Sequence, residues 1–233
     1  MPRVSLTQQV SLAQQVNLTQ HPLSEAAAVL VGLAAFVVVV LDVGWSIVRH
    51  PGVMAHEGAH AVAGWLSFRK IGGITMDAGG NGATLVERGG CLGSVVGFFA
   101  GYVGPSLFGL GAARLIEFGH VVAVLWITLF LLGLLLTAVR WSFGIITVVL
   151  TGAAVFGIAR YTPMHVQMVA GYAIAWLLLL IGVRQIVEHG VYASDGAVLA
   201  SRTAIPRLVW ALLWLAATLA ALAVGGSMLV LRH

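Results

Sequence analysis

Six long apolar runs dominate this sequence, and each is about as long as a membrane is thick. The runs cover residues 26–48, 92–113, 119–139, 141–159, 164–183 and 208–231. A helix of roughly 20 apolar residues spans a hydrocarbon core about 30 Å thick. Lipid offers no hydrogen-bonding partners, so the backbone of such runs must pair with itself, as it does in a helix. The sequence therefore predicts an all-α polytopic membrane protein with about six transmembrane helices.

Charge and composition support this class and exclude others. Of the 233 residues, 60% are hydrophobic and 9% are charged, whereas soluble domains carry about 25% charged residues. Lys and Arg are scattered, with Arg69 and Lys70 as the one adjacent pair, so the chain lacks the basic stripe that nucleic acid binding requires. The single cysteine, Cys91, excludes an internal disulfide. A metal site would therefore need histidine and carboxylate ligands.

The chain divides into a short polar tail and one long unit. The first 21 residues contain a repeat with a spacing of six residues, which begins as Val-Ser-Leu-Thr-Gln-Gln. This pattern fits neither a coiled-coil heptad nor the uninterrupted apolar segment of a signal peptide. We predict that residues 1–25 form a disordered N-terminal tail and that residues 26–233 form a single membrane-embedded domain.

The first apolar run is followed by a helix boundary signal and then by strand-like patterning. Arg-His-Pro occupies residues 49–51, and proline is common in the first turn of a helix. We therefore expect the first transmembrane helix to end near residue 48 and a new element to begin at Pro51. Farther on, residues 74–77 and 83–87 flank a turn-forming Ala-Gly-Gly-Asn-Gly stretch, a pattern that predicts a small β-hairpin.

Six crossings place alternate connections on opposite faces of the membrane. Residues 49–91, 140 and 184–207 then share one face, which carries eight of the twelve Lys and Arg residues. Because positive charge gathers on the cytoplasmic side of membrane proteins, we predict that this face is cytoplasmic.

Small residues recur along the second apolar run. They are spaced four apart at Gly93, Gly97, Gly101, Pro105 and Gly109, so on a helix they form one stripe that lets a neighbouring backbone approach closely. Generic helix packing is the simpler interpretation, and a surface that admits substrate is the alternative.

His56-Glu57-Gly58-Ala59-His60 is the most informative motif. Residues four apart lie on one face of a helix, so both imidazoles can bind the same zinc ion at about 2.0 to 2.1 Å. Glu57 can accept a proton from a water at that metal, the role of a general base. An unpaired glutamate at mid-membrane depth would cost about 2.5 to 3.5 kcal/mol, which favours a function for this one. We predict one zinc ion per chain.

A catalytic zinc needs a third protein ligand and an open fourth position. Five candidates share the predicted face of the HExxH segment: Asp77, Glu87, Glu188, His189 and Asp195. We favour Asp195, because glycine follows it within a stretch of mainly small and apolar residues, 193–200, that could pack beside the zinc helix. The alternative is an ordinary surface-loop aspartate.

Taken in order, these elements resemble the M50 metallopeptidases, and most closely the M50B-like branch related to bacterial site-2 intramembrane proteases. The resemblance rests on the HExxH motif, the glycine-rich hairpin, the Gly-Tyr-Val-Gly-Pro of residues 101–105 and the Ser-Asp-Gly of residues 194–196. It implies a single membrane-embedded metallopeptidase domain in residues 26–233. It also implies that His56, His60 and Asp195 bind zinc and that Glu57 is the general base.

The resemblance further implies cleavage of membrane proteins within or near their transmembrane segment, in a bacterial inner membrane. The expected partners are a transmembrane protein substrate and membrane lipids. A helical substrate must unwind before cleavage, and an edge of the hairpin could receive the extended strand. In the related proteases Asn and Pro usually precede Asp-Gly, but residues 189–194 here are His-Gly-Val-Tyr-Ala-Ser. This difference favours an alternative, a non-proteolytic zinc-containing scaffold or regulator, whereas the presence of Glu57 disfavours it.

Overall fold

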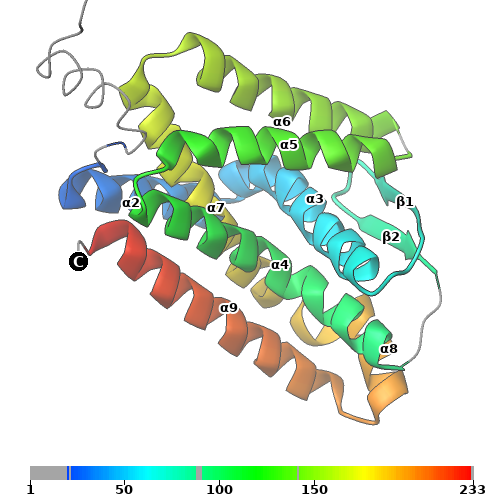
Figure 1. Ribbon diagram of the computed structural model, residues 1–233. Coiled ribbons are helices and arrows are strands. Elements are labelled where there is room, and N and C mark those ends of the chain that lie inside the picture. The colour runs from blue at the N-terminus through cyan, green and yellow to red at the C-terminus, as the bar shows by residue number, and fades with distance from the viewer. Residues whose placement is uncertain (1–19, 21, 88–90, 141, 232–233) are drawn as a thin grey trace, which may run out of the picture.

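The computed structural model describes residues 20, 22–87, 91–140 and 142–231, and the N-terminal repeat lies almost entirely outside this part of the chain. Helices form a bundle with a two-stranded sheet at one end (Figure 1). The elements in chain order are α2 (Glu25–Val40), α3 (Asp42–Leu66), β1 (Ile71–Met76), β2 (Gly82–Val86), α4 (Cys91–Glu117), α5 (Val121–Ala138), α6 (Ser142–Tyr161), α7 (Met164–His189), η1 (Gly190–Tyr192), α8 (Ser194–Thr203) and α9 (Arg207–Val230).

Five of these helices, α4, α5, α6, α7 and α9, are long and apolar enough to cross a membrane. Helices α2 and α3 meet the same criterion only as a pair, bent by 96° at their junction, so the described residues supply up to six crossings. The predicted all-α polytopic architecture with a small hairpin is therefore confirmed. The chain is an integral, multi-pass membrane protein.

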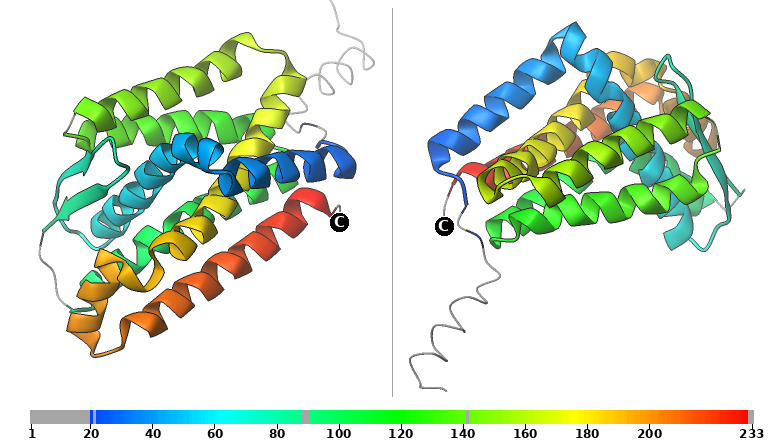
Figure 2. Two further views of the ribbon diagram at one scale, coloured as in Figure 1. Left: turned by 180° about the vertical axis from the view of Figure 1, so that it is seen from behind. Right: turned by 90° about the horizontal axis from the view of Figure 1, so that it is seen from above.

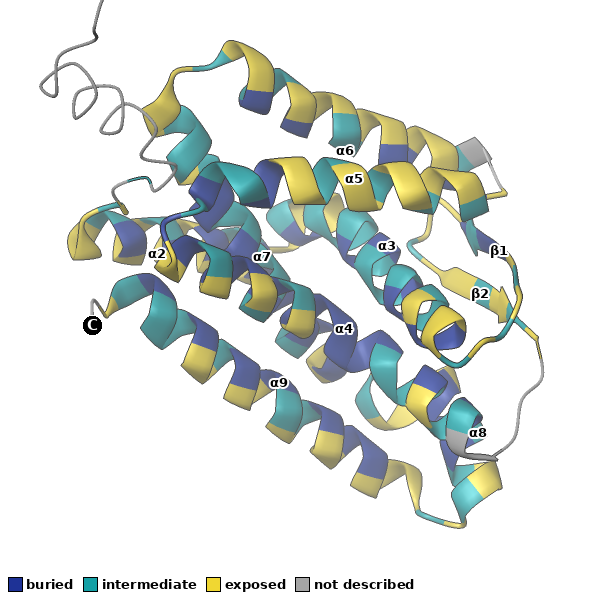
Figure 3. Ribbon diagram, viewed as in Figure 1, coloured by how far each residue is buried: buried dark blue, intermediate teal, exposed yellow. Residues whose placement is uncertain are grey.

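The outer surface of the bundle also fits a membrane. Large apolar side chains are exposed on the outward faces of the helices (Figure 3). Leu30 of α2, Phe130 of α5, Leu150 of α6 and Leu212 of α9 are each more than half exposed. Such a surface would be an aggregation hazard in water, whereas lipid acyl chains solvate it.

The bend between α2 and α3 corrects the boundary expected near residue 48 (Figure 2). Helix α2 ends at Val40, and Leu41 is extended, with φ −76° and ψ 133°. A Cβ at Gly44 would overlap the carbonyl oxygen of Val38, so the sharp turn requires glycine there. Pro51 lies inside α3 rather than at its start. It removes one helical hydrogen bond, but the helix runs on through it to Leu66.

The hairpin forms as predicted, and its turn is held by Asp77. Strands β1 and β2 pair antiparallel with Thr75 opposite Ala83. The Asp77 carboxylate accepts hydrogen bonds from the backbone N–H and the side-chain amide of Asn81, both at 2.9 Å. These two bonds lower the pKa of Asp77 below its usual value, because they stabilise the ionised form.

The two edges of this small sheet have different surroundings. On the β1 side, Ile74 forms a bridge with Val139, and the N–H of Arg140 donates to the Ile74 carbonyl at 2.9 Å. The connection between α5 and α6 therefore occupies that edge. The outer edge of β2 pairs with no strand among the described residues.

Helix α8, which the sequence analysis did not anticipate, is docked by an aromatic cluster. Leu199 of α8 is fully buried against Tyr102 of α4 and Trp214 of α9. The rings of Tyr102 and Trp214 stack with their centroids 4.5 Å apart. A Cβ at Gly196 would lie 3.6 Å from the Trp214 ring, so the first turn of α8 sits close to α9. This packing fixes the position of Asp195, the residue before Gly196.

Candidate metal centre

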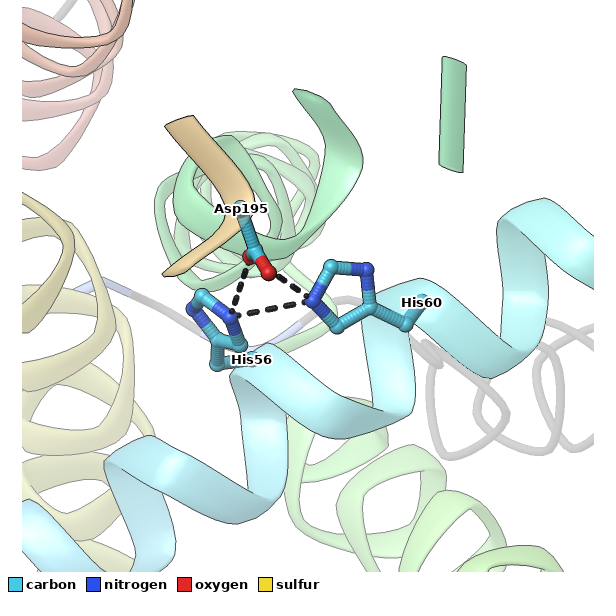
Figure 4. A group of neighbouring side chains, drawn as sticks. All are labelled: His56, His60 and Asp195. Carbon is cyan, nitrogen blue, oxygen red and sulfur yellow. Dashed lines mark hydrogen bonds and ion pairs between the residues drawn. The ribbon is translucent and has the colours of Figure 1, made fainter. Parts of the chain in front are cut away.

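Three predicted site residues meet at one point, as Figure 4 shows. His56 and His60 project from one face of α3, and Asp195 comes from the first turn of α8. The His60 Nε2 atom lies 3.1 Å from both His56 Nε2 and Asp195 Oδ2, and His56 Nε2 lies 3.3 Å from Asp195 Oδ2. Ligands about 2.0 to 2.1 Å from a tetrahedral zinc ion stand roughly 3.3 Å apart. The triangle of donor atoms therefore has the size that zinc requires.

The protonation of His60 supports a cation at this point. Its Nδ1–H donates to the Gly97 carbonyl oxygen at 2.8 Å, because a carbonyl can only accept. In the neutral imidazole Nε2 then carries a lone pair, and that lone pair faces the Asp195 carboxylate. Two acceptors in contact are favourable only when a proton or a metal cation lies between them. A hydrogen bond to the distal imidazole nitrogen is also the usual way in which a ligating histidine is oriented.

Gly101 of α4 leaves room at the centre. A Cβ there would overlap His60 Nε2 and lie 2.7 Å from His56 Nε2. Together with the Gly97 carbonyl, this contact shows that the middle of the predicted stripe, at Gly97 and Gly101, faces the two imidazoles. The stripe permits close helix packing and also forms one wall of the metal site.

We expect Gly101→Ala to weaken metal binding by about tenfold or more, because the new methyl group would occupy the space between the imidazoles. Metal analysis of the purified protein provides the measurement. Gly111→Ala on the same helix is the matched control, since a Cβ there meets nothing within 4 Å. Full metal content in Gly101→Ala would contradict the position assigned to the ion.

The Asp195 carboxylate is ionised in this environment. Burial alone would raise its pKa, but the hydrogen bonds and positive charge of His56 and His60 outweigh burial and hold the pKa of Asp195 below its ordinary value. Its side chain is 12% exposed, and those of His56 and His60 are 13% and 11% exposed. An ionised carboxylate in a nearly dry site is an effective ligand for a divalent cation.

Glu57 lines the same cavity as the three candidate metal ligands, and the volume of this cavity is about 500 Å³. It is 4% exposed, and its Oε2 accepts a hydrogen bond from the Thr84 hydroxyl at 2.6 Å. The cavity is walled by α3, β2, α4, the end of α7 and the start of α8. A buried carboxylate, three potential metal ligands and space for a substrate therefore occur together.

The other predicted ligand candidates do not join the imidazoles. Asp77 holds the hairpin turn, and the Glu87 carboxylate accepts from the backbone N–H of Lys70 at 3.4 Å. Glu188 and His189 are exposed at the end of α7, although His189 lines the cavity. Among the described residues, His56, His60 and Asp195 form the one cluster with metal-ligand spacing.

Sequence reasoning missed several polar residues of the cavity, among them Thr84 and Gln185. Gln185 is 4% exposed, and its Oε1 is buried without a hydrogen-bond partner in the described structure. It lies one turn before His189 on α7, which continues beyond the apolar run that predicted the helix. No signal in the sequence distinguished either residue, because each becomes polar lining only through contacts between distant elements.

Comparison with known proteins gives one match. A family model described as Peptidase M50B-like matches residues 29–225, which include all four predicted site residues. Peptidases of the M50 family are generally zinc-dependent. No curated protein and no solved structure gives a significant match.

Proposed function

This chain belongs to the M50B-like peptidase family, and we propose that it is a zinc-dependent endopeptidase that cleaves membrane proteins within or near their transmembrane segments. The observation that supports this proposal best is the meeting of two imidazoles and one carboxylate beside a separate buried glutamate, Glu57, in one cavity. A structural zinc site has no need of a free carboxylate base and usually has four protein ligands. Its proposed location is a bacterial inner membrane, with lipid around the bundle.

In this proposal each polar residue has a distinct task. His56, His60 and Asp195 hold one zinc ion, and the His60 ring is kept in place by the Gly97 carbonyl. When bound, zinc supplies Lewis acidity, which activates water near neutral pH and polarises the scissile carbonyl. Glu57 takes the proton of the attacking water on a carboxylate oxygen and passes it to the leaving amine.

The substrate is proposed to bind as an extended strand. A peptide bond within a helix is shielded, so the substrate helix must unwind locally before cleavage. Residues 82–84 and Val86 of β2 line the cavity, and the outer edge of β2 pairs with no other strand in the described structure. Addition of a strand at this edge would bring substrate backbone into the cavity. The unpartnered Gln185 Oε1 offers an acceptor for a substrate N–H.

Removal and return of the metal tests the proposal. We expect the purified, lipid-reconstituted protein to cleave at least one member of a panel of single-span membrane proteins. A strong zinc chelator should abolish this cleavage, and added Zn²⁺ should restore it. Mass spectrometry of the products locates the cut, which we expect within or next to the transmembrane segment. Co-purification of uncut substrates with the zinc-loaded wild type would instead favour the scaffold alternative.

A further inference from the structure

The carboxylate of Glu57 is held by β2 and not by its own helix. The Thr84 hydroxyl lies 2.6 Å from Glu57 Oε2 and 3.0 Å from the Glu57 carbonyl oxygen. A hydroxyl has one proton to donate, and the shorter distance is typical of a charge-assisted bond to a carboxylate. Thr84 therefore directs its proton to Oε2, which ties the side chain of Glu57 to the hairpin.

The second carboxylate oxygen of Glu57 lies close to Gly82, which is two residues before Thr84 on the same strand. A Cβ at Gly82 would lie 2.6 Å from Glu57 Oε1 and 2.7 Å from Val53 Cγ1. Both distances are too short for real contacts, so a larger residue at position 82 would force the side chains of Glu57 and Val53 to move. Residues 82 and 84 lie on the same face of the strand. Thr84 bonds to one oxygen of Glu57, and the backbone of Gly82 passes close to the other.

We propose that Thr84 is a positioning residue for the base, an inference that rests on the proposed peptidase function. With Oε2 engaged by Thr84, the Glu57 side chain keeps one rotamer, and Oε1 is the oxygen left to take the proton. The strand that orients the base is also the strand proposed to receive the substrate. A substrate strand that binds to β2 would thus bind to the same strand that keeps Glu57 in position relative to the imidazoles on α3.

The kinetic test compares Thr84→Val, which removes the hydroxyl at constant shape, with Thr84→Ser, which keeps it. We expect Thr84→Val to lower kcat about 10- to 100-fold with little change in KM or zinc content. Thr84→Ser should recover most of the rate. Thr75→Val is the matched control and should cleave like wild type, because the Thr75 hydroxyl bonds to Ala83 on the exposed side of the hairpin.

A stability measurement tests the contact without relying on activity. We expect Thr84→Val to lower the unfolding temperature of the zinc-loaded protein in detergent by about 2 to 4 °C. The same change should have no further effect in a Glu57→Leu background, because its partner is already gone. Thr75→Val should have the same effect in both backgrounds.

The two measurements separate the inference from the function on which it rests. Wild-type kcat in Thr84→Val, or equal destabilisation in both Glu57 backgrounds, would overturn the role of Thr84 and leave the peptidase proposal intact. If wild type cleaves nothing while the coupling between Thr84 and Glu57 persists, the peptidase proposal fails and the contact stands. Gly82→Ala provides a second variant, which we expect to lower kcat and keep zinc because its methyl group would displace Oε1.

Discussion

Glu57→Gln should bind zinc as wild type does and cleave a transmembrane substrate about 10²- to 10⁴-fold more slowly. The amide keeps nearly the same size and still accepts the Thr84 hydroxyl through its oxygen, so the packing against β2 is preserved. What it loses is the ability to take a proton from water. Metal analysis and cleavage assays on the same preparation measure the two effects separately.

Glu87→Gln is the appropriate control for this variant. It makes the same chemical change at an exposed glutamate just after β2, where the side chain accepts a hydrogen bond from the backbone N–H of Lys70. It should retain wild-type cleavage. A Glu57→Gln protein that cleaves at the wild-type rate would refute the assignment of the base, whatever its zinc content.

Asp195→Ala should lose most of its zinc and, with it, all measurable cleavage. Removing this carboxylate leaves two ligands, too few for a protein zinc site, and leaves His60 Nε2 without its anionic neighbour. The helix itself should persist, since Leu199 and Gly196 dock α8 through contacts that do not involve the carboxylate. Zinc per chain by metal analysis is the measurement.

Asp77→Ala provides the comparison, because it removes a carboxylate on the same predicted face that does not reach the imidazoles. It should retain zinc even if the hairpin turn loosens, since Asp77 bonds only to Asn81 and its neighbours. Unchanged zinc stoichiometry in Asp195→Ala would remove Asp195 from the site. His189, which also lines the cavity, would then be the next candidate for the third zinc ligand.

Local periodicity was sufficient to predict the parts of this site that lie on one element. The spacing of His56 and His60 places both rings on one helix face, and counting crossings brought the segment containing Asp195 to the same side. The hairpin followed from its glycine-rich turn. These predictions depend on spacing and parity, which the sequence displays directly.

Contacts between distant elements could not be obtained in this way. The hydroxyl of Thr84 bonds to Glu57, although the two residues are 27 positions apart in the sequence. No sequence pattern near either residue indicates this pairing. The bend at Leu41 was also missed, because the apolar run continues through it and the nearby Pro51 offered a stronger boundary signal. Here close packing of Gly44 against α2 decided the geometry.

That bend makes the orientation of the two imidazoles on α3 independent of the length of α2. In an unbroken helix, each residue inserted upstream would rotate everything after it by about 100° and swing both imidazoles away from Asp195. The extended backbone at Leu41 breaks the helix, so a rotation of α2 is not passed on to α3. A residue gained or lost in α2 would therefore leave the azimuth of His56 and His60 on α3 unchanged.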